Sequence, residues 1–165
     1  EVLSTDAYFL PHDRIPRFYS PTRSMSLPDY NRPDSIDLPL LLADIDARAG
    51  AANAPRVLLI EGLMVLHLPE IRERLGLRLF IELDADQRAL RRLVRNLGTQ
   101  NDPLDGINTP ETIASYFIES AKVGHERYVE PSRKFADLIL RGDGDFQRSA
   151  EMVAAVIRGM LEIGK

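Results

Sequence analysis

The sequence predicts an α/β fold in which a parallel sheet is covered by helices on both faces. Short apolar runs such as RVLLI (56–60) and ADLIL (136–140) are typical of strands that are buried on both sides. Amphipathic segments of helical length alternate with these runs along the chain. Alternating strands and helices are the pattern of a parallel sheet, so the 165 residues are expected to form one domain.

The elements of this fold follow one another in a definite order. Residues 2–5 form the first strand, and the proline- and aromatic-rich stretch from Tyr8 to Pro33 shows neither a helical nor a strand period. Ser35 or Asp37 caps an apolar helix that ends at Gly50. Further strands are expected near 56–60, 78–83 and 136–140, and further helices over 69–76, from Asp84 or Asp86 to Leu97, from Thr109 to about Glu130, and over 145–163, with Met152 and Met160 in the core.

The composition excludes several classes of protein. The chain has 21 basic and 25 acidic residues, and its net charge of −4 argues against nucleic-acid and membrane-surface partners. The absence of cysteine excludes disulfides and thiolate chemistry, and no apolar run approaches the ~20 residues of a membrane span. The first residues, EVLSTD, lack the basic segment of a signal peptide. We therefore expect a cytoplasmic protein with small-molecule partners, and the sequence leaves open whether it forms a homo-oligomer.

Two acidic residues follow predicted buried strands. Asp6 comes just after the first strand, and Glu61 comes directly after the strand at 56–60. In a parallel sheet both side chains project from the same edge, where ligands bind. Each acid taken alone could equally cap a turn. Together they suit a Mg²⁺ ion, or one base and one metal ligand.

The predicted helix that ends at Leu97 carries a stripe of arginines. The stripe consists of Arg88, Arg91, Arg92 and Arg95, and the opposite face consists of Leu90, Leu93, Val94 and Leu97. A solvated helix face usually mixes charges, whereas this face contains arginine alone. Guanidinium groups bind phosphate oxygens through paired hydrogen bonds. The pattern therefore favours a helix that binds polyphosphate over a merely solvated face.

Five segments of the sequence, in this order, resemble one family of enzymes. They are LSTDAYF around Asp6, YNRPDSIDLPLLL from Tyr30, RVLLIEGLMVL from Arg56, DADQRALRRLVRN from Asp84 and HERYVEPSRKFADLIL from His125. In combination they resemble the uridine kinase family of P-loop kinases, which includes the nicotinamide riboside kinases and is related to phosphoribulokinase. The resemblance covers nearly the whole chain and implies ATP and Mg²⁺ as cofactors.

The resemblance also implies roles for individual residues. Asp6 matches the acid that deprotonates the sugar hydroxyl and neighbours Mg²⁺, and Glu61 matches an acid that helps to hold this ion. Arg88 matches the first lid arginine, which reaches the substrate ribose, and Arg91, Arg92 and Arg95 match lid residues near the transferring phosphates. The implied catalytic residues are Asp6, Arg88, Arg91 and Arg92, and the implied substrate contacts are Tyr30, Asn31, Asp34 and Arg88.

The chain departs from the family pattern at two places in the substrate site. The family usually has Asp-His-Pro-Asp where this chain has Asn-Arg-Pro-Asp, so Asn31 replaces an acid that binds ribose hydroxyls. Uridine kinases also carry a hairpin with pyrimidine contacts before the third strand, and this chain has only residues 50–55 there. The substrate is therefore unassigned beyond a nucleoside or similar small hydroxyl compound.

A third departure concerns the phosphate-binding loop. A Gly-x-x-x-x-Gly-Lys-Ser/Thr motif between a strand and a helix should precede Asp6, and these residues do not contain it. We expect a P-loop kinase-like domain over 1–165 that lacks its first, central strand, with the missing residues upstream in the natural protein. Two functions remain: an ATP-dependent kinase, or a catalytically inactive relative that acts as a binding or assembly module. The retained acids and arginines favour the kinase.

Overall fold

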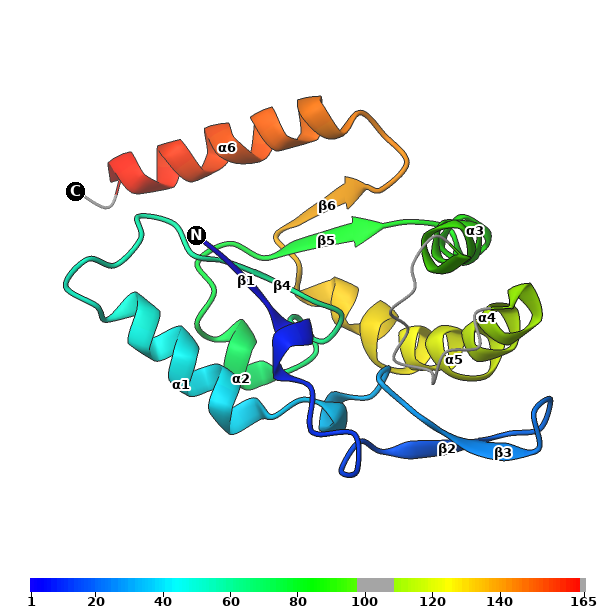
Figure 1. Cartoon of the computed structure of the whole chain (residues 1–165). Coiled ribbons are helices and arrows are strands. Elements are labelled where there is room, and N and C mark those ends of the chain that lie inside the picture. Colours follow the sequence, from blue (N-terminus) through cyan, green and yellow to red (C-terminus); the bar gives the residue numbers. More distant parts are fainter. Residues whose placement is uncertain (98–108, 164–165) are drawn as a thin grey trace.

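The computed structural model describes residues 1–97 and 109–163. It has an α/β architecture (Figure 1). The strands are β1 (Val2–Ser4), β2 (Arg17–Ser20), β3 (Met25–Pro28), β4 (Leu59–Glu61), β5 (Leu79–Glu82) and β6 (Leu138–Arg141). The helices are α1 (Leu38–Ala49), α2 (Pro69–Arg72), α3 (Ala85–Leu97), α4 (Pro110–Tyr116), α5 (Lys122–Gly124) and α6 (Phe146–Ile163).

Four of the strands form two parallel pairs. β1 pairs with β4, with Leu3 opposite Ile60, and β5 pairs with β6, with Phe80 opposite Ile139. Parallel pairing of strands that are distant in sequence requires crossover connections, as in an α/β fold. Among the described residues, no ladder of hydrogen bonds connects β4 to β5. The prediction of an α/β fold with parallel strands is confirmed, and within residues 1–97 and 109–163 these four strands form two separate pairs instead of one continuous sheet.

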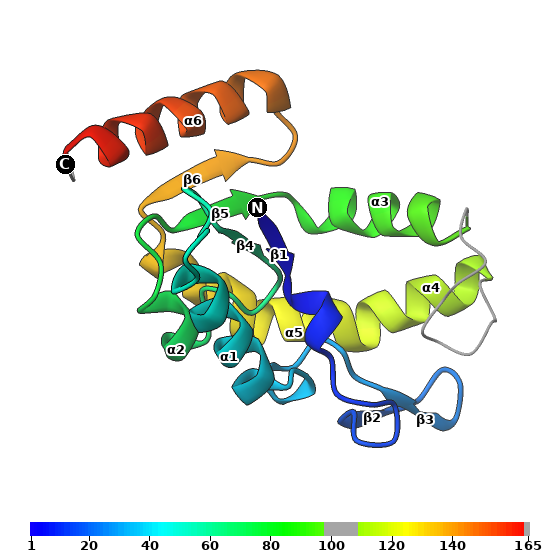
Figure 2. The same ribbon diagram turned by 60° about the vertical axis from the view of Figure 1, so that its left-hand side comes forward.

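Helices lie on both sides of these strands. In both views α6 lies on one side, and α1 and α2 lie on the other (Figures 1 and 2). Asp37 caps α1 by accepting a hydrogen bond from the backbone N–H of Leu40. The main core lies on the side of α1 and α2, where Leu41 and Ile71 are fully buried and Phe80 of β5 joins them. The strands are therefore packed mainly through one face.

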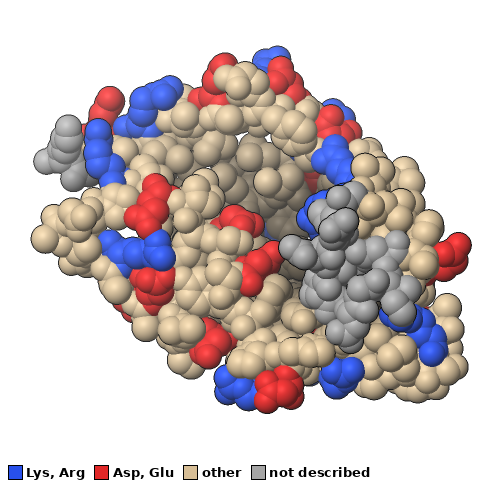
Figure 3. Space-filling model, viewed as in Figure 1, with Lys and Arg blue, Asp and Glu red and all other residues tan. Residues whose placement is uncertain are grey.

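The opposite face of the strands exposes apolar side chains. Ile81 points away from the buried Phe80, as alternation along a strand requires, and is 66% exposed. No residue of α6 is buried, and Met152 and Met160, which the sequence placed in the core, are 56% and 42% exposed. Figure 3 shows this side of the molecule hollowed below α6. The core prediction for these methionines is wrong, because α6 does not pack tightly against the strands.

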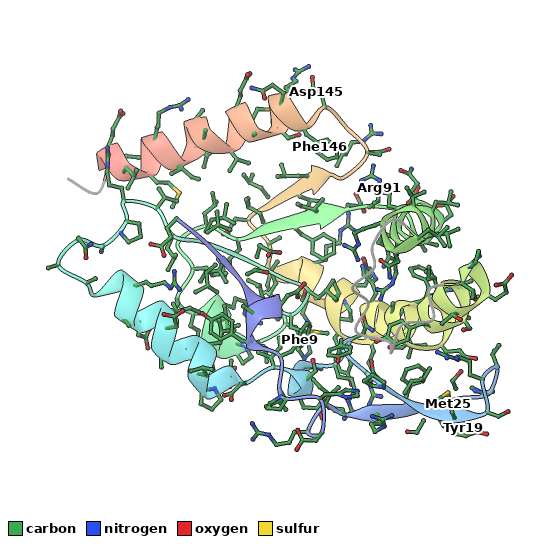
Figure 4. All side chains as sticks on the ribbon, viewed as in Figure 1. Phe9, Tyr19, Met25, Arg91, Asp145 and Phe146 are labelled. Carbon is green, nitrogen blue, oxygen red and sulfur yellow. The ribbon has the colours of Figure 1, made fainter. Side chains whose placement is uncertain are left out.

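The stretch that the sequence predicted to be irregular contains a hairpin. β2 and β3 pair in antiparallel register. Phe18 and Leu27 pack on Tyr116 of α4 and form a second, smaller core. Tyr19 and Met25 of the same hairpin are exposed, and Tyr19 lies on the face opposite to Phe18 (Figure 4). The strand pattern was missed because prolines stand beside or within these short strands and mask their alternation.

The stretch from Thr109 to Phe135 is helical but not regular. The side chain of Thr109 caps α4 by accepting a hydrogen bond from the backbone N–H of Thr112. Two π-helical turns, Phe117–Ala121 and His125–Val129, flank the short α5, and a 3₁₀ turn over Glu130–Phe135 ends the stretch. Such π-helical turns occur frequently at functional sites. None of the helices in the described part of the chain has both the length and the apolar character needed to cross a membrane.

Candidate active site

Asp6 and Glu61 lie at the carboxyl ends of two neighbouring strands. β1 and β4 stay in register up to Ser4 opposite Glu61, and Asp6 follows in a 3₁₀ turn. Asp6 as a residue is exposed, but protein atoms withdraw its carboxyl group partly from water. This burial, followed by the negative charge of Glu61, raises the pKa of Asp6. The two acids are therefore electrostatic neighbours.

Gly62 allows the ends of β1 and β4 to approach each other closely. A Cβ atom on Gly62 would lie 1.8 Å from Oγ1 of Thr5, and its φ of 153° is one that other residues rarely adopt. Thr5 is itself buried and directly precedes Asp6. This close contact lies directly beside both acids in the sequence, because Gly62 follows Glu61.

The arginine stripe of α3 faces a cavity of about 280 Å³. All four arginines line this cavity, and the helical stretch of α4 and α5 with its π-helical turns forms another wall. The lining residues are Asn31, Leu63, Met64, Leu83, Arg88, Arg91, Arg92, Arg95, Phe117, Ala121, Gly124, His125 and Val129. The predicted face of α3 is thus also one surface of a concave site, with a volume near the lower end of small-molecule pockets.

The apolar face of α3 is turned toward solvent. Leu90 and Val94 are 62% and 74% exposed, and no residue of α3 is buried. Leu93 borders a shallow apolar groove together with Ile113 of α4. An amphipathic helix normally buries its apolar face and exposes its charges. α3 directs its cations inward instead, which is the orientation that binding an anion requires.

Arg88 shares its side of the cavity with His125. Arg88 donates a hydrogen bond from Nε to the carbonyl oxygen of Leu83 at 3.1 Å. Burial lowers the pKa of Arg88, while Glu130 and Glu126 act in the opposite direction. Burial, followed by the charge of Arg88, also lowers the pKa of His125. His125 is therefore neutral at neutral pH, and the positive charge of the cavity comes from the arginines.

Arg91 and Arg92 are held by different parts of the structure. Arg91 donates from Nη1 to the carbonyl oxygen of Gly142, after β6, at 2.9 Å, and its guanidinium lies 5.9 Å from the ring centre of Phe146 (Figure 4). The guanidinium of Arg92 lies 5.1 Å from the ring centre of Tyr116, a cation–π contact. α3 is thereby tied both to the start of α6 and to α4.

The three predicted substrate contacts of the loop before α1 are separated in the structure. Asn31 is 4% exposed and lines the cavity. Tyr30 packs edge to face on Phe9 with ring centres 5.0 Å apart and does not line it. Asp34 is exposed and forms a two-bond ion pair with Arg32, which lowers the pKa of Asp34. Of the three residues, Asn31 alone belongs to the cavity wall.

Arg95 connects the acid pair to the cavity. Asp6 and Glu61 do not line the cavity, but the charge of Arg95, which does, lowers the pKa of Asp6. Within residues 1–97 and 109–163, no group of three or more His, Asp or Glu side chains is placed to hold a metal ion. The pair nevertheless suits Mg²⁺, because this ion takes one or two protein carboxylates and keeps water or phosphate oxygens as its other ligands.

The sequence matches a known protein family over most of its length. The sequence model of the phosphoribulokinase / uridine kinase family matches residues 17–146, which include Asn31, Glu61 and the arginine stripe. The chain belongs to the phosphoribulokinase / uridine kinase family. The resemblance inferred from the five sequence segments is thereby confirmed.

Several bacterial uridine kinases are similar to this member of the phosphoribulokinase / uridine kinase family. The uridine kinase of Chlamydia pneumoniae is 31% identical over 147 residues, which cover 76% of this chain and 63% of that protein. The uridine kinase of Deinococcus deserti is 29% identical over an alignment of 178 residues, with 95% of this chain and 81% of that protein covered. The uridine kinase of Chloroflexus aggregans is 29% identical over an alignment of 174 residues, which covers 92% of this chain and 80% of that protein. The chain therefore spans less than two thirds of the first relative.

Sequence reasoning missed part of the cavity wall of this family member. Phe117, Ala121 and His125 recur at intervals of four residues, a spacing that brings side chains to the same side of a helix. That periodicity could have grouped them. It could not have shown that this side of the helical stretch borders the cavity, because only the packing of α3 against α4 places it there.

Proposed function

We propose that this protein is an ATP-dependent kinase that phosphorylates a hydroxyl of a nucleoside or a similar small molecule. The observation that carries the proposal is the convergence of the four arginines and Asn31 on one cavity, which Arg95 connects to Asp6 and Glu61. The names of the bacterial relatives support it. Phosphoryl transfer needs a positioned nucleophile, a metal ion and cations around the phosphate oxygens, and the site offers residues for each.

In the proposed reaction a hydroxyl of the substrate attacks the γ-phosphorus of ATP. A bond forms between the hydroxyl oxygen and this phosphorus, the bond to the β–γ bridging oxygen breaks, and ADP leaves. Asp6 accepts the proton of the hydroxyl. The proposed roles of the arginines are substrate binding by Arg88 and stabilisation of the negative charge on the transferred group by Arg91, Arg92 and Arg95.

The acid pair and the loop before α1 complete the proposed site. Asp6 and Glu61 would hold Mg²⁺, which supplies neutralisation of phosphate charge when it is bound. The raised pKa of Asp6 makes its carboxylate a better proton acceptor than an ordinary aspartate. Asn31 contacts the substrate from the cavity wall, and Tyr30 and Asp34 are proposed to contact parts of the substrate that extend beyond it.

The proposal is tested by an assay of phosphoryl transfer from γ-labelled MgATP to uridine and other nucleosides. We expect a labelled nucleoside monophosphate. Asp6→Asn should lower the rate by about 10²- to 10⁴-fold, because the variant cannot accept the proton. Asp13→Asn, which changes an exposed aspartate of the following loop, is the matched control and should keep the rate. Equal rates in the two variants would contradict the role of Asp6.

We further propose that a parallel strand lies between β4 and β5 in the nucleotide-binding form, so that residues 1–165 with this strand make one domain. Val2, Leu59 and Ile81 are 65%, 45% and 66% exposed on one side of the two strand pairs. No hydrogen-bonded ladder joins β4 to β5 in the described residues. A strand followed by a phosphate-binding loop and a helix, supplied from outside the 165 residues, would cover these side chains and complete the sheet.

This strand can be tested on residues 1–165 alone. Each buried backbone group left without a partner costs about 1–3 kcal/mol, whereas a whole domain has only about 5–15 kcal/mol of stability. We therefore expect the isolated chain to associate, or to melt without a cooperative transition, in circular dichroism and analytical ultracentrifugation. A monomer that melts cooperatively would contradict the proposed strand.

A catalytically inactive binding or assembly module was the alternative expected from the sequence. The similar proteins of Chlamydia pneumoniae, Deinococcus deserti and Chloroflexus aggregans are uridine kinases and give this alternative no support. The transfer assay, carried out with the whole protein, also decides between the two functions. An inactive module would produce no labelled monophosphate from any nucleoside.

A further inference from the structure

Asn31 is held by a row of three residues from the neighbouring helical stretch. Tyr116, Ser120 and Gly124 are spaced four residues apart, and all three meet Asn31. Its Nδ2 atom lies 3.2 Å from the hydroxyl of Tyr116 and 2.8 Å from Oγ of Ser120. A Cβ on Gly124 would lie 2.3 Å from the carbonyl oxygen of Asn31, so only glycine allows this close approach. The exposed fractions of Asn31, Ser120 and Tyr116 are 4%, 3% and 2%.

The proton of the Ser120 hydroxyl is already committed to another partner. Oγ of Ser120 lies 2.7 Å from Oδ1 of Asp29, and a carboxylate can only accept a hydrogen bond. Ser120 must therefore donate to Asp29. Toward Asn31 it offers only a lone pair, so the atom of Asn31 that faces Ser120 must be a donor.

The hydroxyl of Tyr116 is committed in the same way. It lies 3.2 Å from the carbonyl oxygen of Pro28, which can only accept, so Tyr116 donates to Pro28. The backbone N–H of Tyr30 also points to this hydroxyl, at 3.4 Å. Tyr116 therefore faces Asn31 as an acceptor too, and both N–H bonds of the Asn31 amide are used within the protein.

The hydrogen bonds that Ser120 donates to Asp29 and Tyr116 donates to Pro28 fix the direction of the Asn31 amide. If the amide were rotated by half a turn, its oxygen would face two oxygens that have no proton to give, and a buried donor would lose both partners. Among the described residues no donor is recorded on the amide oxygen Oδ1 of Asn31, although the residue lines the cavity. The remaining side of the amide, its oxygen, is therefore the side available to a ligand.

We propose that Asp29, Ser120 and Tyr116 are positioning residues that present Oδ1 of Asn31 to the cavity as an uncharged acceptor for a sugar hydroxyl of the substrate. This proposal rests on the proposed function and names one of its contacts. The arginines of the cavity can only donate hydrogen bonds, so they select the phosphate, whereas an amide oxygen selects a group that donates. A polyol next to a phosphate, as in a nucleoside monophosphate, provides both groups.

The orientation of the amide is tested without ligand by NMR of the ¹⁵N-labelled whole protein. Both side-chain amide protons of Asn31 should exchange with water much more slowly than those of the exposed Asn53. Ser120→Ala should accelerate this exchange. Ser115→Ala is the matched control, since Ser115 is a buried serine of the same helical stretch that donates to the backbone of Thr112 and does not touch Asn31. Exchange as fast as that of Asn53 would overturn the proposed orientation.

The ligand contact is tested by calorimetry with uridine, 2′-deoxyuridine and 3′-deoxyuridine. The parent protein should bind uridine at least about fivefold more tightly than the analogue that lacks the contacted hydroxyl. Ser120→Ala should move this ratio toward one, and Ser115→Ala should leave it unchanged. If the ratio of the affinity for uridine to that for the deoxy analogue is the same in Ser120→Ala as in Ser115→Ala, the positioning role is overturned. Failure of the parent protein to bind any of the three compounds would instead contradict uridine as the substrate, and the NMR experiment then decides the orientation alone.

A substitution at position 31 tests the same hydrogen bonds through stability. Asn31→Asp places a carboxylate against Ser120 and Tyr116, whose protons go to Asp29 and to the carbonyl oxygen of Pro28, so the variant should melt at a lower temperature than the parent. Asn53→Asp, at an exposed position, is the matched control and should leave the melting temperature nearly unchanged. An Asn31→Asp variant as stable as the parent would contradict the chain of hydrogen bonds.

Discussion

The ionisation of Asp6 depends on burial and on two charged neighbours. Its pKa lies above the ordinary value of 3.8 because of burial and then Glu61, while Arg95 acts in the opposite direction. Glu61→Gln should therefore lower the pKa of Asp6, and Arg95→Gln should raise it further. The carboxyl carbon of Asp6, followed by ¹³C NMR during a pH titration, gives this pKa directly. A pKa that does not respond to Glu61→Gln would show that the two acids are not neighbours.

The same shift has a defined consequence for stability. The native state holds the proton of Asp6 more tightly than the unfolded chain does, so the contribution of Asp6 to the free energy of unfolding falls as the pH rises from 3.8 through the raised pKa. Glu61→Gln should weaken this dependence. Denaturant titrations of the parent and the variant across this pH window give the free energy of unfolding at each pH. The same slope of this free energy against pH in both proteins would contradict the prediction.

Two glycines should respond in opposite ways to the same substitution. Gly124→Ala forces a methyl group against the backbone of Asn31 and should destabilise the protein by about 1–3 kcal/mol, as overpacking usually does. Gly159→Ala meets no atom within 4 Å on α6 and should stabilise the protein by up to about 1 kcal/mol, because alanine favours the helix. Thermal melting of both variants measures the difference. A neutral Gly124→Ala would contradict the close approach of Asn31.

At the scale of elements, α3 should separate binding from stability. Arg91 is exposed and contacts Gly142 and Phe146, whereas Arg92 is half-buried over the ring of Tyr116. We expect both Arg91→Ala and Arg92→Ala to weaken ADP binding, but only Arg92→Ala to lower the melting temperature clearly, because it also removes packing. Calorimetry and thermal melting give the two quantities. Unchanged ADP affinity in both variants would contradict a phosphate-binding helix.

The sequence predicted those elements whose signals are local. Asp37 and Gly50 mark the ends of α1, and Pro110 marks the start of α4, because caps and prolines act within a few residues. The arginine stripe was predicted for the same reason, since the spacing of charges fixes a helix face. The side to which that face turns depends on packing between elements. Exposed Leu90 and Val94 show that the usual rule of apolar burial does not hold for α3.

Other features depended on contacts between distant residues and were not predictable from local patterns. The hairpin of β2 and β3 is held by Glu119, which accepts hydrogen bonds from Ser20 and Thr22 and lies about 100 positions later in the sequence. The different positions of Asn31 and Asp34 in the structure also depend on a contact with a distant residue. Both stand in one turn of the chain, yet the helical stretch around Ser120 draws only Asn31 to the cavity wall.

At the scale of the whole molecule, one cavity joins segments from distant parts of the chain. The loop before α1 contributes Asn31, α3 contributes the arginines, and the helical stretch of α4 and α5 closes the wall with His125. In Figure 3 acidic side chains lie at the lower edge of the hollow below α6. In the proposed kinase the arginines would bind phosphate, Asn31 would accept a hydrogen bond from a hydroxyl, and Asp6 and Glu61 would hold the metal ion.

The most direct test of this arrangement compares nucleosides with their 5′-monophosphates as ligands of the whole protein. Isothermal calorimetry with the four common ribonucleosides and their monophosphates should find at least one monophosphate that binds about tenfold or more tightly than its nucleoside, because hydrogen bonds to charged groups are the stronger ones. The combined change of Arg91 and Arg92 to Ala should abolish this preference, and Arg56→Ala, at an exposed arginine outside the cavity, should preserve it. A protein that binds no monophosphate more tightly than its nucleoside, or that keeps the preference without these two arginines, would contradict a nucleoside kinase site in this cavity.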